Sequence, residues 1–254
     1  MLARFCRIST SAFVRRASSL PPPLGLAEVQ EAAARIARSG VSRTPVIHSA
    51  WINEQCGLSV HFKCEHLQRT GSFKFRGAAN AVMQLSDERA AKGVVAHSAG
   101  NHGAALAAAA AMRCIPCSVI VPRGTSEAKL DNMRRYGANV ILCEPNQQAR
   151  VEAAAAEAAR MGGAASIHPY DQAEVIAGQG TIALELLEQS PNLDAILTPT
   201  SGGGMLAGIA VAARALKPGL RVIAVEPRGK RLGEALSKGQ RVLDPSTANR
   251  LLDT

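Results

Sequence analysis

The run Gly71-Ser72-Phe73-Lys74-Phe75-Arg76-Gly77 places a lysine in a turn rich in small residues. A strand is expected before it, over residues 58–65, and a helix after it, over residues 75–86. Burial and the positive end of the helix dipole both disfavour the ammonium form of such a lysine, and its neutral amine attacks carbonyl groups. The alternative interpretation is a surface lysine that only flanks a helix.

Two later loops also carry residues suited to chemistry. Ser98-Ala99-Gly100-Asn101-His102-Gly103 brings polar side chains to the start of an expected helix. Thr200-Ser201-Gly202-Gly203-Gly204-Met205 is a glycine loop before another helix, where free backbone N–H groups bind phosphate. It matches neither the dinucleotide-binding pattern nor a P-loop. A reactive lysine, a polar loop and a phosphate loop together indicate pyridoxal phosphate as the cofactor.

Alternating short strands and helices are expected to position these loops. The strands are predicted near residues 59–64, 94–97, 118–121, 139–143, 165–168, 195–199 and 221–226. The helices are predicted near residues 27–39, 75–86, 102–112, 126–135, 148–161, 174–189, 204–216 and 230–238. This alternation is typical of an α/β fold with parallel sheets, in which ligands bind at the carboxyl ends of the strands. All three loops are therefore expected to share one cleft.

Five runs in this order carry a resemblance to a known family. They are Arg43-Thr44-Pro45-Val46, Thr70-Gly71-Ser72-Phe73-Lys74, Ser98-Ala99-Gly100-Asn101-His102, the run from Val175 to Glu185, and the run from Gly202 to Ala210. Over roughly residues 27–254, the chain resembles the serine racemase and serine/threonine dehydratase family of fold-type II pyridoxal-phosphate enzymes. No internal repeat is visible.

The resemblance implies a two-domain α/β fold with open parallel sheets. Residues 24–92 and 169–254 would form the large domain and residues 93–168 the small one, with the cofactor between them and closure excluding water. Family members continue beyond Thr254. The C-terminal part of the large domain is therefore expected to be missing, which would leave an unpaired sheet edge.

The resemblance also implies a role for each site residue. Lys74 would form a Schiff base with the cofactor and then take the α-proton of the substrate. Phe73 would pack beside the cofactor ring, with an ordinary core position as the alternative. The cofactor-binding residues would be Phe73, Lys74, Asn101, Gly202, Gly203, Gly204 and Met205. The substrate carboxylate would bind Ser98, Asn101 and His102, although a buried neutral histidine is an equal alternative for His102.

Ala99 indicates which reaction to expect. Racemases of the family carry a serine there, which returns a proton on the ring face opposite the lysine, whereas dehydratases carry alanine. The prediction is an ammonia-lyase that converts L-serine, L-threonine or both to a 2-oxo acid and ammonia. The alternatives are a serine racemase, a β-replacement enzyme such as a cysteine synthase, and a truncated, non-catalytic paralogue. Ala104 replaces the family's usual glutamine, so the substrate preference stays open.

No metal is expected to bind. Glu226 matches the first ligand of the family's cation site, but Leu232 replaces its aspartate, and oxygen-ligand cations need carboxylates. Glu226 is instead expected to be an ion-pair partner at a strand end. Ala50 and Arg69 depart from the family's nucleotide-binding pattern at the dimer interface, so nucleotide binding is not carried over.

Composition excludes other classes of partner. The 254 residues carry a net charge of +9 and only 3% aromatic residues. No basic patch interleaved with aromatics indicates nucleic-acid binding, and no apolar run approaches the about 20 residues of a membrane helix. The expected partners are an amino-acid substrate and, in the full-length protein, a second copy in a homodimer. Cys114 and Cys117 form a lone CxxC, interpreted as packing thiols.

The first twenty residues have a composition of their own. They contain arginine, serine and threonine but no acidic residue, and they lack an uninterrupted apolar stretch. This pattern favours a mitochondrial or plastid transit peptide over a secretory signal, with a disordered basic arm as the alternative. Pro21-Pro22-Pro23 is expected to act as a stiff linker, so residues 1–23 are assigned as leader and linker.

Overall fold

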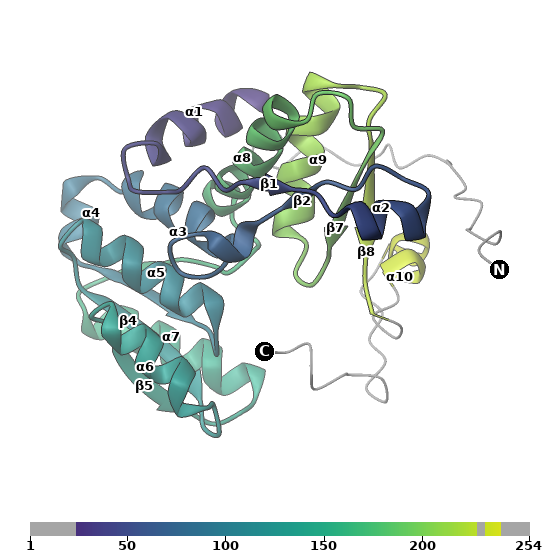
Figure 1. Ribbon diagram of the computed structural model, residues 1–254. Helices are drawn as coiled ribbons and strands as arrows, with labels where there is room; N and C mark the ends of the chain where they lie inside the picture. The colour runs from purple at the N-terminus through teal and green to yellow at the C-terminus, as the bar shows by residue number, and fades with distance from the viewer. Residues whose placement is uncertain (1–23, 228–231, 240–254) are drawn as a thin grey trace.

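The computed structural model describes residues 24–227 and 232–239 (Figure 1). The predicted transit peptide and proline linker, at residues 1–23, lie outside the described residues. Within the described ranges, helices and strands alternate along most of the chain, which confirms the predicted α/β class.

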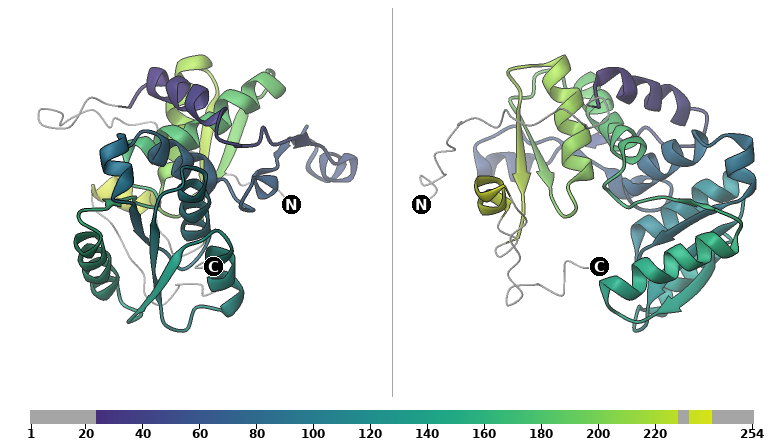
Figure 2. Two further views of the ribbon diagram at one scale, coloured as in Figure 1. Left: turned by 90° about the vertical axis from the view of Figure 1, so that its left-hand side faces the viewer. Right: turned by 180° about the vertical axis from the view of Figure 1, so that it is seen from behind.

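A four-stranded parallel sheet with the order β5-β4-β3-β6 occupies the middle of the sequence. Its strands are β3 (Val94–His97), β4 (Cys117–Pro122), β5 (Asn139–Cys143) and β6 (Ala165–Ser166). The two central strands are almost wholly buried because a helix covers each face: α5 (Asn101–Met112) on one side and α7 (Gln147–Arg160) on the other. Figure 2 shows α7 lying across the sheet in the view from behind. Buried parallel strands of this kind explain the continuous apolar runs of the sequence.

The helices α1 (Leu26–Ile36), α3 (Lys74–Met83), α8 (Ala173–Gln189) and α9 (Gly204–Leu216) pack together beside this sheet. Glycines allow the closest crossings. A Cβ added at Gly178 would lie 2.6 Å from the Cα of Gly77, and one at Gly208 would lie 2.3 Å from the carbonyl oxygen of Ile176. The backbones of α3 and α9 therefore both pack directly against α8.

Strands β7 (Ala195–Pro199) and β8 (Arg221–Val225) form a parallel pair next to α9. Leu197 and Val225 remain 65% and 45% exposed, while Ile196 is buried against α9. One face of this pair is thus packed and the other shows apolar side chains. Beyond β8, the Oε1 atom of Glu226 accepts a hydrogen bond of 2.6 Å from the backbone N–H of Leu232, the first residue of α10 (Leu232–Lys238). Glu226 therefore caps a helix, a contact that its expected role as an ion-pair partner did not include.

The region before Lys74 differs from its prediction. Strand β2 covers only Phe62–Lys63 and pairs antiparallel with β1 (Val46–Ile47), and a 3-10 turn, Glu65–Leu67, follows it. The prediction of a parallel strand over residues 58–65 that leads directly to the lysine turn is therefore wrong. Phe62 is 38% exposed and Leu58 is 67% exposed. This segment therefore belongs to no sheet that is buried on both faces. Its apolar residues had led to the prediction of a longer strand than the structure contains.

Short helices were also missed. Helix α2 (Ala50–Cys56) begins after Ser49, whose Oγ accepts the N–H of Ile52, and ends at Gly57 with a φ of 61°. Helix α4 (Asp87–Ala91) begins in the same way after Ser86. A serine before each helix, and a glycine after α2, were visible signals. The remaining helix, α6, spans Glu127–Arg135.

Two further predictions concern cysteines and membranes. Cys117 is buried on β4 and its pKa is raised to about 12 by burial, as expected of a packing thiol. Cys114 lies outside any strand, with a φ of 55°. Among the described helices, we find none that is both long enough and apolar enough to cross a bilayer.

Candidate active site

Lys74 is the first residue of α3, and its amine lies near one backbone carbonyl and two aromatic rings. Its Nζ donates a hydrogen bond of 2.7 Å to the carbonyl oxygen of Pro169. The same atom lies 5.3 Å from the centre of the Phe73 ring and 6.0 Å from the centre of the Tyr170 ring. Burial lowers the pKa of Lys74 to about 8. The neutral form that a nucleophile or base requires is therefore far more populated near physiological pH than in an ordinary lysine.

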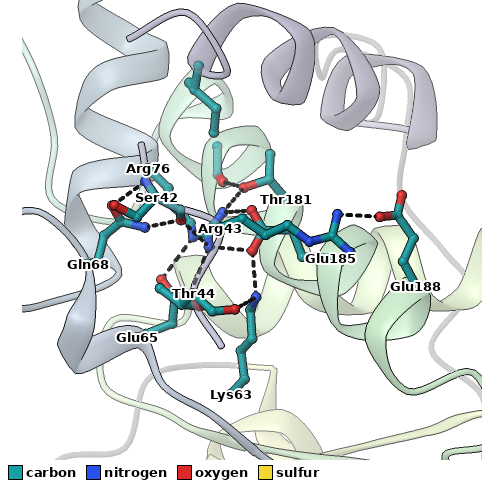
Figure 3. A network of polar contacts seen from close by, with 12 residues as sticks. Ser42, Arg43, Thr44, Lys63, Glu65, Gln68, Arg76, Thr181, Glu185 and Glu188 are labelled. Carbon is teal, nitrogen blue, oxygen red and sulfur yellow. Dashed lines mark hydrogen bonds and ion pairs between the residues drawn. The ribbon is translucent and has the colours of Figure 1, made fainter. Parts of the chain in front are cut away.

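A buried network of charges supports α3 immediately behind the lysine (Figure 3). The side chain of Arg76 is fully buried and binds two carboxylates, Glu65 side-on and Glu185 end-on, with two hydrogen bonds to each. Its Nε and Nη2 donate to Glu65 at 2.8 Å each, and its Nη1 and Nη2 donate to Glu185 at 2.7 and 2.8 Å. These bonds join the 3-10 turn and α3, which are near each other in the sequence, to α8, which lies 109 positions further along at Glu185.

Lys63 completes this network. Its Nζ donates to Glu185 at 2.5 Å and to the carbonyl oxygen of Thr44 at 2.8 Å. Two cations and two anions are thus paired, so the cluster of Lys63, Glu65, Arg76 and Glu185 carries no net charge. Thr44 also donates to Glu65 at 2.6 Å. The run Arg43-Thr44-Pro45-Val46 singled out from the sequence therefore contributes a structural threonine.

The polar loop ends β3 and begins α5. The Oγ of Ser98 accepts the N–H groups of Gly100 and Gly103 at 3.3 and 3.1 Å, which leaves its hydroxyl proton free to be donated elsewhere. Asn101 is the exposed first residue of α5, and Ala99 is partly buried beside it. The loop thus points a hydroxyl, an amide and the start of a helix toward the carboxyl end of the sheet.

His102 faces the protein interior instead. It is 3% exposed, and its Nε2 lies 3.0 Å from the carbonyl oxygen of Ile167, so Nε2 must carry the proton. Burial lowers its pKa to about 3, which keeps the ring neutral, and its Nδ1 has no hydrogen-bond partner. A neutral ring in this tautomer has no N–H left for a carboxylate. The geometry favours the alternative of a buried neutral histidine.

The glycine loop has close neighbours at two of its three glycines. A Cβ on Gly202 would lie 2.2 Å from ring carbons of Tyr170, and one on Gly204 would lie 2.4 Å from the carbonyl oxygen of Tyr170. Gly203 has open space around it but a φ of 91°, which disfavours other residues there. Because α9 begins at Gly204, the N–H groups of Gly204 and Met205 are free of helical partners.

One segment, residues 167–170, joins the three loops, and sequence reasoning missed it. The carbonyl of Ile167 binds His102, the carbonyl of Pro169 binds Lys74, and Tyr170 covers Gly202 and Gly204. The segment follows β6, where the end of a parallel strand was itself a signal for site residues. The predicted site residues Phe73, Lys74, His102, Gly202 and Gly204 are therefore gathered around one short stretch.

Comparison with known proteins agrees with this geometry. A family profile described as "Pyridoxal-phosphate dependent enzyme" matches residues 37–253, which is most of the chain. The chain belongs to this pyridoxal-phosphate-dependent enzyme family. It is 50% identical to the serine racemase of Arabidopsis thaliana over 201 residues, covering 79% of this chain and 60% of that protein.

Two other members of the pyridoxal-phosphate family place the chain more closely. The β-hydroxyaspartate dehydratase of Paracoccus denitrificans (strain Pd 1222) is 49% identical over 187 residues, covering 74% of this chain and 59% of that protein. The structure of maize serine racemase superimposes with a TM-score of 0.84 at 41% identity, covering 87% of this chain and 67% of that one. The predicted fold-type II membership is thereby confirmed. The chain spans about three fifths of the length of the curated relatives it matches.

The residues of the site fit the cofactor of this pyridoxal-phosphate family. A buried lysine with a lowered pKa supplies a neutral amine for its aldehyde, with Phe73 at its side. The glycine loop offers N–H groups at a helix start for its phosphate, and side chains at Gly202 and Gly204 would not fit. In the part of the chain that the structure describes, we find no group of three or more metal-ligating side chains. The individual cofactor-binding and substrate-binding roles assigned to the site residues stay predictions.

Proposed function

We propose that the protein is a pyridoxal-phosphate-dependent ammonia-lyase that acts on L-serine, L-threonine or both. The products would be the 2-oxo acid and ammonia, formed by loss of the α-proton and the β-hydroxyl group and by hydrolysis of the enamine that results. When bound, the cofactor supplies an electron sink for the charge left at the α-carbon. The observation that carries the proposal is Ala99, which has no proton to return.

The chain's own residues support two parts of this reaction, the removal of the α-proton and the binding of the substrate carboxylate. The Nζ of Lys74, with a pKa of about 8, accepts the α-proton, and the carbonyl of Pro169 orients it. The hydroxyl of Ser98 and the N-terminal end of α5 at Asn101 offer donors to a substrate carboxylate. Burial of the amine between Phe73 and Tyr170 limits the access of water to it.

A serine racemase is the second candidate, supported by the names of several relatives. A racemase must deliver a proton to the face of the α-carbon opposite the lysine, and a serine at position 99 does this in the racemases that the sequence resembles. The alanine at position 99 weighs against this candidate more than overall identity supports it, because identity does not report on one proton donor.

The substitution Ala99→Ser tests this choice. We expect the parent chain to form pyruvate from L-serine with little D-serine, and Ala99→Ser to raise the ratio of D-serine to pyruvate by about tenfold or more, since it adds an acid at the opposite face. Chiral chromatography and a coupled pyruvate assay measure the two products. Ala99→Gly, which adds no hydroxyl, is the matched control. Faster formation of D-serine than of pyruvate by the parent chain would contradict the proposal.

A substrate with a second carboxylate is a further candidate for the same lyase reaction. The Nε of Arg150, in the first turn of α7, is buried without a hydrogen-bond partner. Arg150 is close enough to His97, at the end of β3, to help lower its pKa, after burial and His168. A guanidinium with an unpartnered Nε at this edge suits a carboxylate, and one relative is named for β-hydroxyaspartate. The pyruvate assay, run beside an oxaloacetate assay with 3-hydroxyaspartate, decides between the substrates.

We also propose that the protein forms a homodimer through the segment β1–α2–β2. This segment exposes large apolar side chains: Ile47 at 51%, Trp51 at 69% and Leu58 at 67%. Figure 1 shows it extending along one side of the fold, in dark blue. Such a patch is typical of a protein interface. Sedimentation velocity is expected to give the mass of a dimer for the parent chain and of a monomer for Trp51→Asp, while Glu54→Asp, on the same helix, should leave the dimer intact.

A further inference from the structure

Tyr170 is the residue of the site whose role neither the sequence pattern nor the family resemblance supplied. Its ring lies where a Cβ on Gly202 would be, at 2.2 Å from the nearest ring carbons, and its carbonyl oxygen lies 2.4 Å from the corresponding position on Gly204. Two of the three loop glycines therefore face the same residue. Tyr170 can pack there only because these two positions carry no side chain.

The same residue also borders the reactive amine. The Nζ of Lys74 lies 6.0 Å from the centre of the Tyr170 ring and is hydrogen bonded to the carbonyl of the preceding residue, Pro169. An aromatic face at this distance attracts an ammonium and confines a neutral amine. Tyr170 is therefore placed between the lysine turn and the glycine loop. These two parts of the site must bind the opposite ends of one cofactor.

Contacts with His168 fix the orientation of Tyr170. The two rings meet edge-to-face with centres 4.6 Å apart at 84°. The Nδ1 of His168 accepts the N–H groups of Tyr170 and Asp171 at 3.3 and 2.8 Å, so its proton is on Nε2. Burial, the largest cause, lowers the pKa of His168 and favours this neutral form. A turn locked in this way leaves the tyrosine ring little freedom.

We propose that Tyr170 is a positioning residue for the cofactor, which sets the distance between the glycine loop and Lys74 through its aromatic ring. The inference rests on the cofactor of the family and not on the reaction that follows. It holds for a lyase and a racemase alike, so a failure of the proposed function leaves it standing. The positioning role belongs to the aromatic ring and not to the hydroxyl group, because the contacts with Gly202, Lys74 and His168 all involve the ring.

The test measures the dissociation constant of pyridoxal phosphate for the full chain, by titrating the lysine-dependent absorbance band. Tyr170→Phe is expected to bind within about twofold of the parent, and Tyr170→Ala about tenfold more weakly, because only the second removes the ring. Tyr170→Leu, which keeps a large apolar side chain and so protects the fold, is expected to weaken binding to the same extent. Parent-like binding by Tyr170→Leu or Tyr170→Ala would overturn the proposal.

A double-mutant cycle gives a second, independent readout. Gly202→Ala is expected to weaken binding about tenfold through its clash with the ring, and adding Tyr170→Ala is expected to cause no further loss. Additive losses would show that the two residues act separately and would overturn the proposal. Hydrogen exchange of the cofactor-free chain gives the structural readout. Faster exchange over residues 200–206 is expected in Tyr170→Leu but not in Tyr170→Phe, and equal exchange in both would also count against the proposal.

Discussion

Replacing Lys74 with alanine is expected to lower the lyase rate by about 10⁴-fold or more, because the reaction loses both its covalent anchor and its base. The visible absorbance band of the bound cofactor that depends on this amine should disappear as well. Both are measured on the purified chain with added pyridoxal phosphate. Lys92→Ala, which removes an exposed lysine outside the site, is the matched control. A Lys74→Ala chain that keeps the band while remaining folded would contradict the assignment.

The pH dependence of this band tests the environment of the amine. Burial disfavours the ammonium, so the pKa of Lys74 is lowered to about 8 and the neutral amine forms at lower pH than in an ordinary lysine. The rate at which the chain captures the cofactor should therefore rise between about pH 7 and 9, whereas an exposed lysine would give a midpoint near about 10.4. Stopped-flow absorbance measures this rate. A rate that rises only above about pH 9.5 would show that the amine is exposed to water.

Replacing Arg76 with methionine is expected to lower the free energy of unfolding by about 3–5 kcal/mol, enough to unfold a marginal protein. Methionine fills similar space but leaves Glu65 and Glu185, which are 13% and 17% exposed, without their shared partner. Urea denaturation followed by circular dichroism measures the change. Because Lys74 begins the same helix, cofactor binding should weaken in parallel.

Two further variants separate charge and geometry from general damage. Arg76→Lys keeps the positive charge but cannot form two hydrogen bonds to each carboxylate, so an intermediate loss of about 1–3 kcal/mol is expected. Arg43→Met removes the 2.6 Å ion pair with Glu188, in which both side chains are more than half exposed. That change should cost less than about 1 kcal/mol. Equal losses of unfolding free energy for Arg76→Met and Arg43→Met would show that burial of the network adds nothing to the stability of the protein.

Much of the fold was predictable from local pattern. The bounds predicted for β3, β5, β7 and α9 (94–97, 139–143, 195–199 and 204–216) agree with the structure. These are short apolar strands between turn residues and a helix that starts at a glycine, so the local sequence alone defines them. The antiparallel pairing of β1 with β2 was not predicted. Each strand is only two residues long, which is too short to show an alternation of apolar and polar residues.

Local residue patterns were enough to identify the candidate site residues: a lysine at a helix start, a polar loop and a glycine loop, each recognisable within a few positions. How these parts come together depends on contacts between residues that are distant in the sequence. The contact between Lys74 and Pro169 spans 95 positions, and that between Arg76 and Glu185 spans 109. No local preference encodes such pairs, because they form when α3 and α8 pack through Gly77 and Gly178.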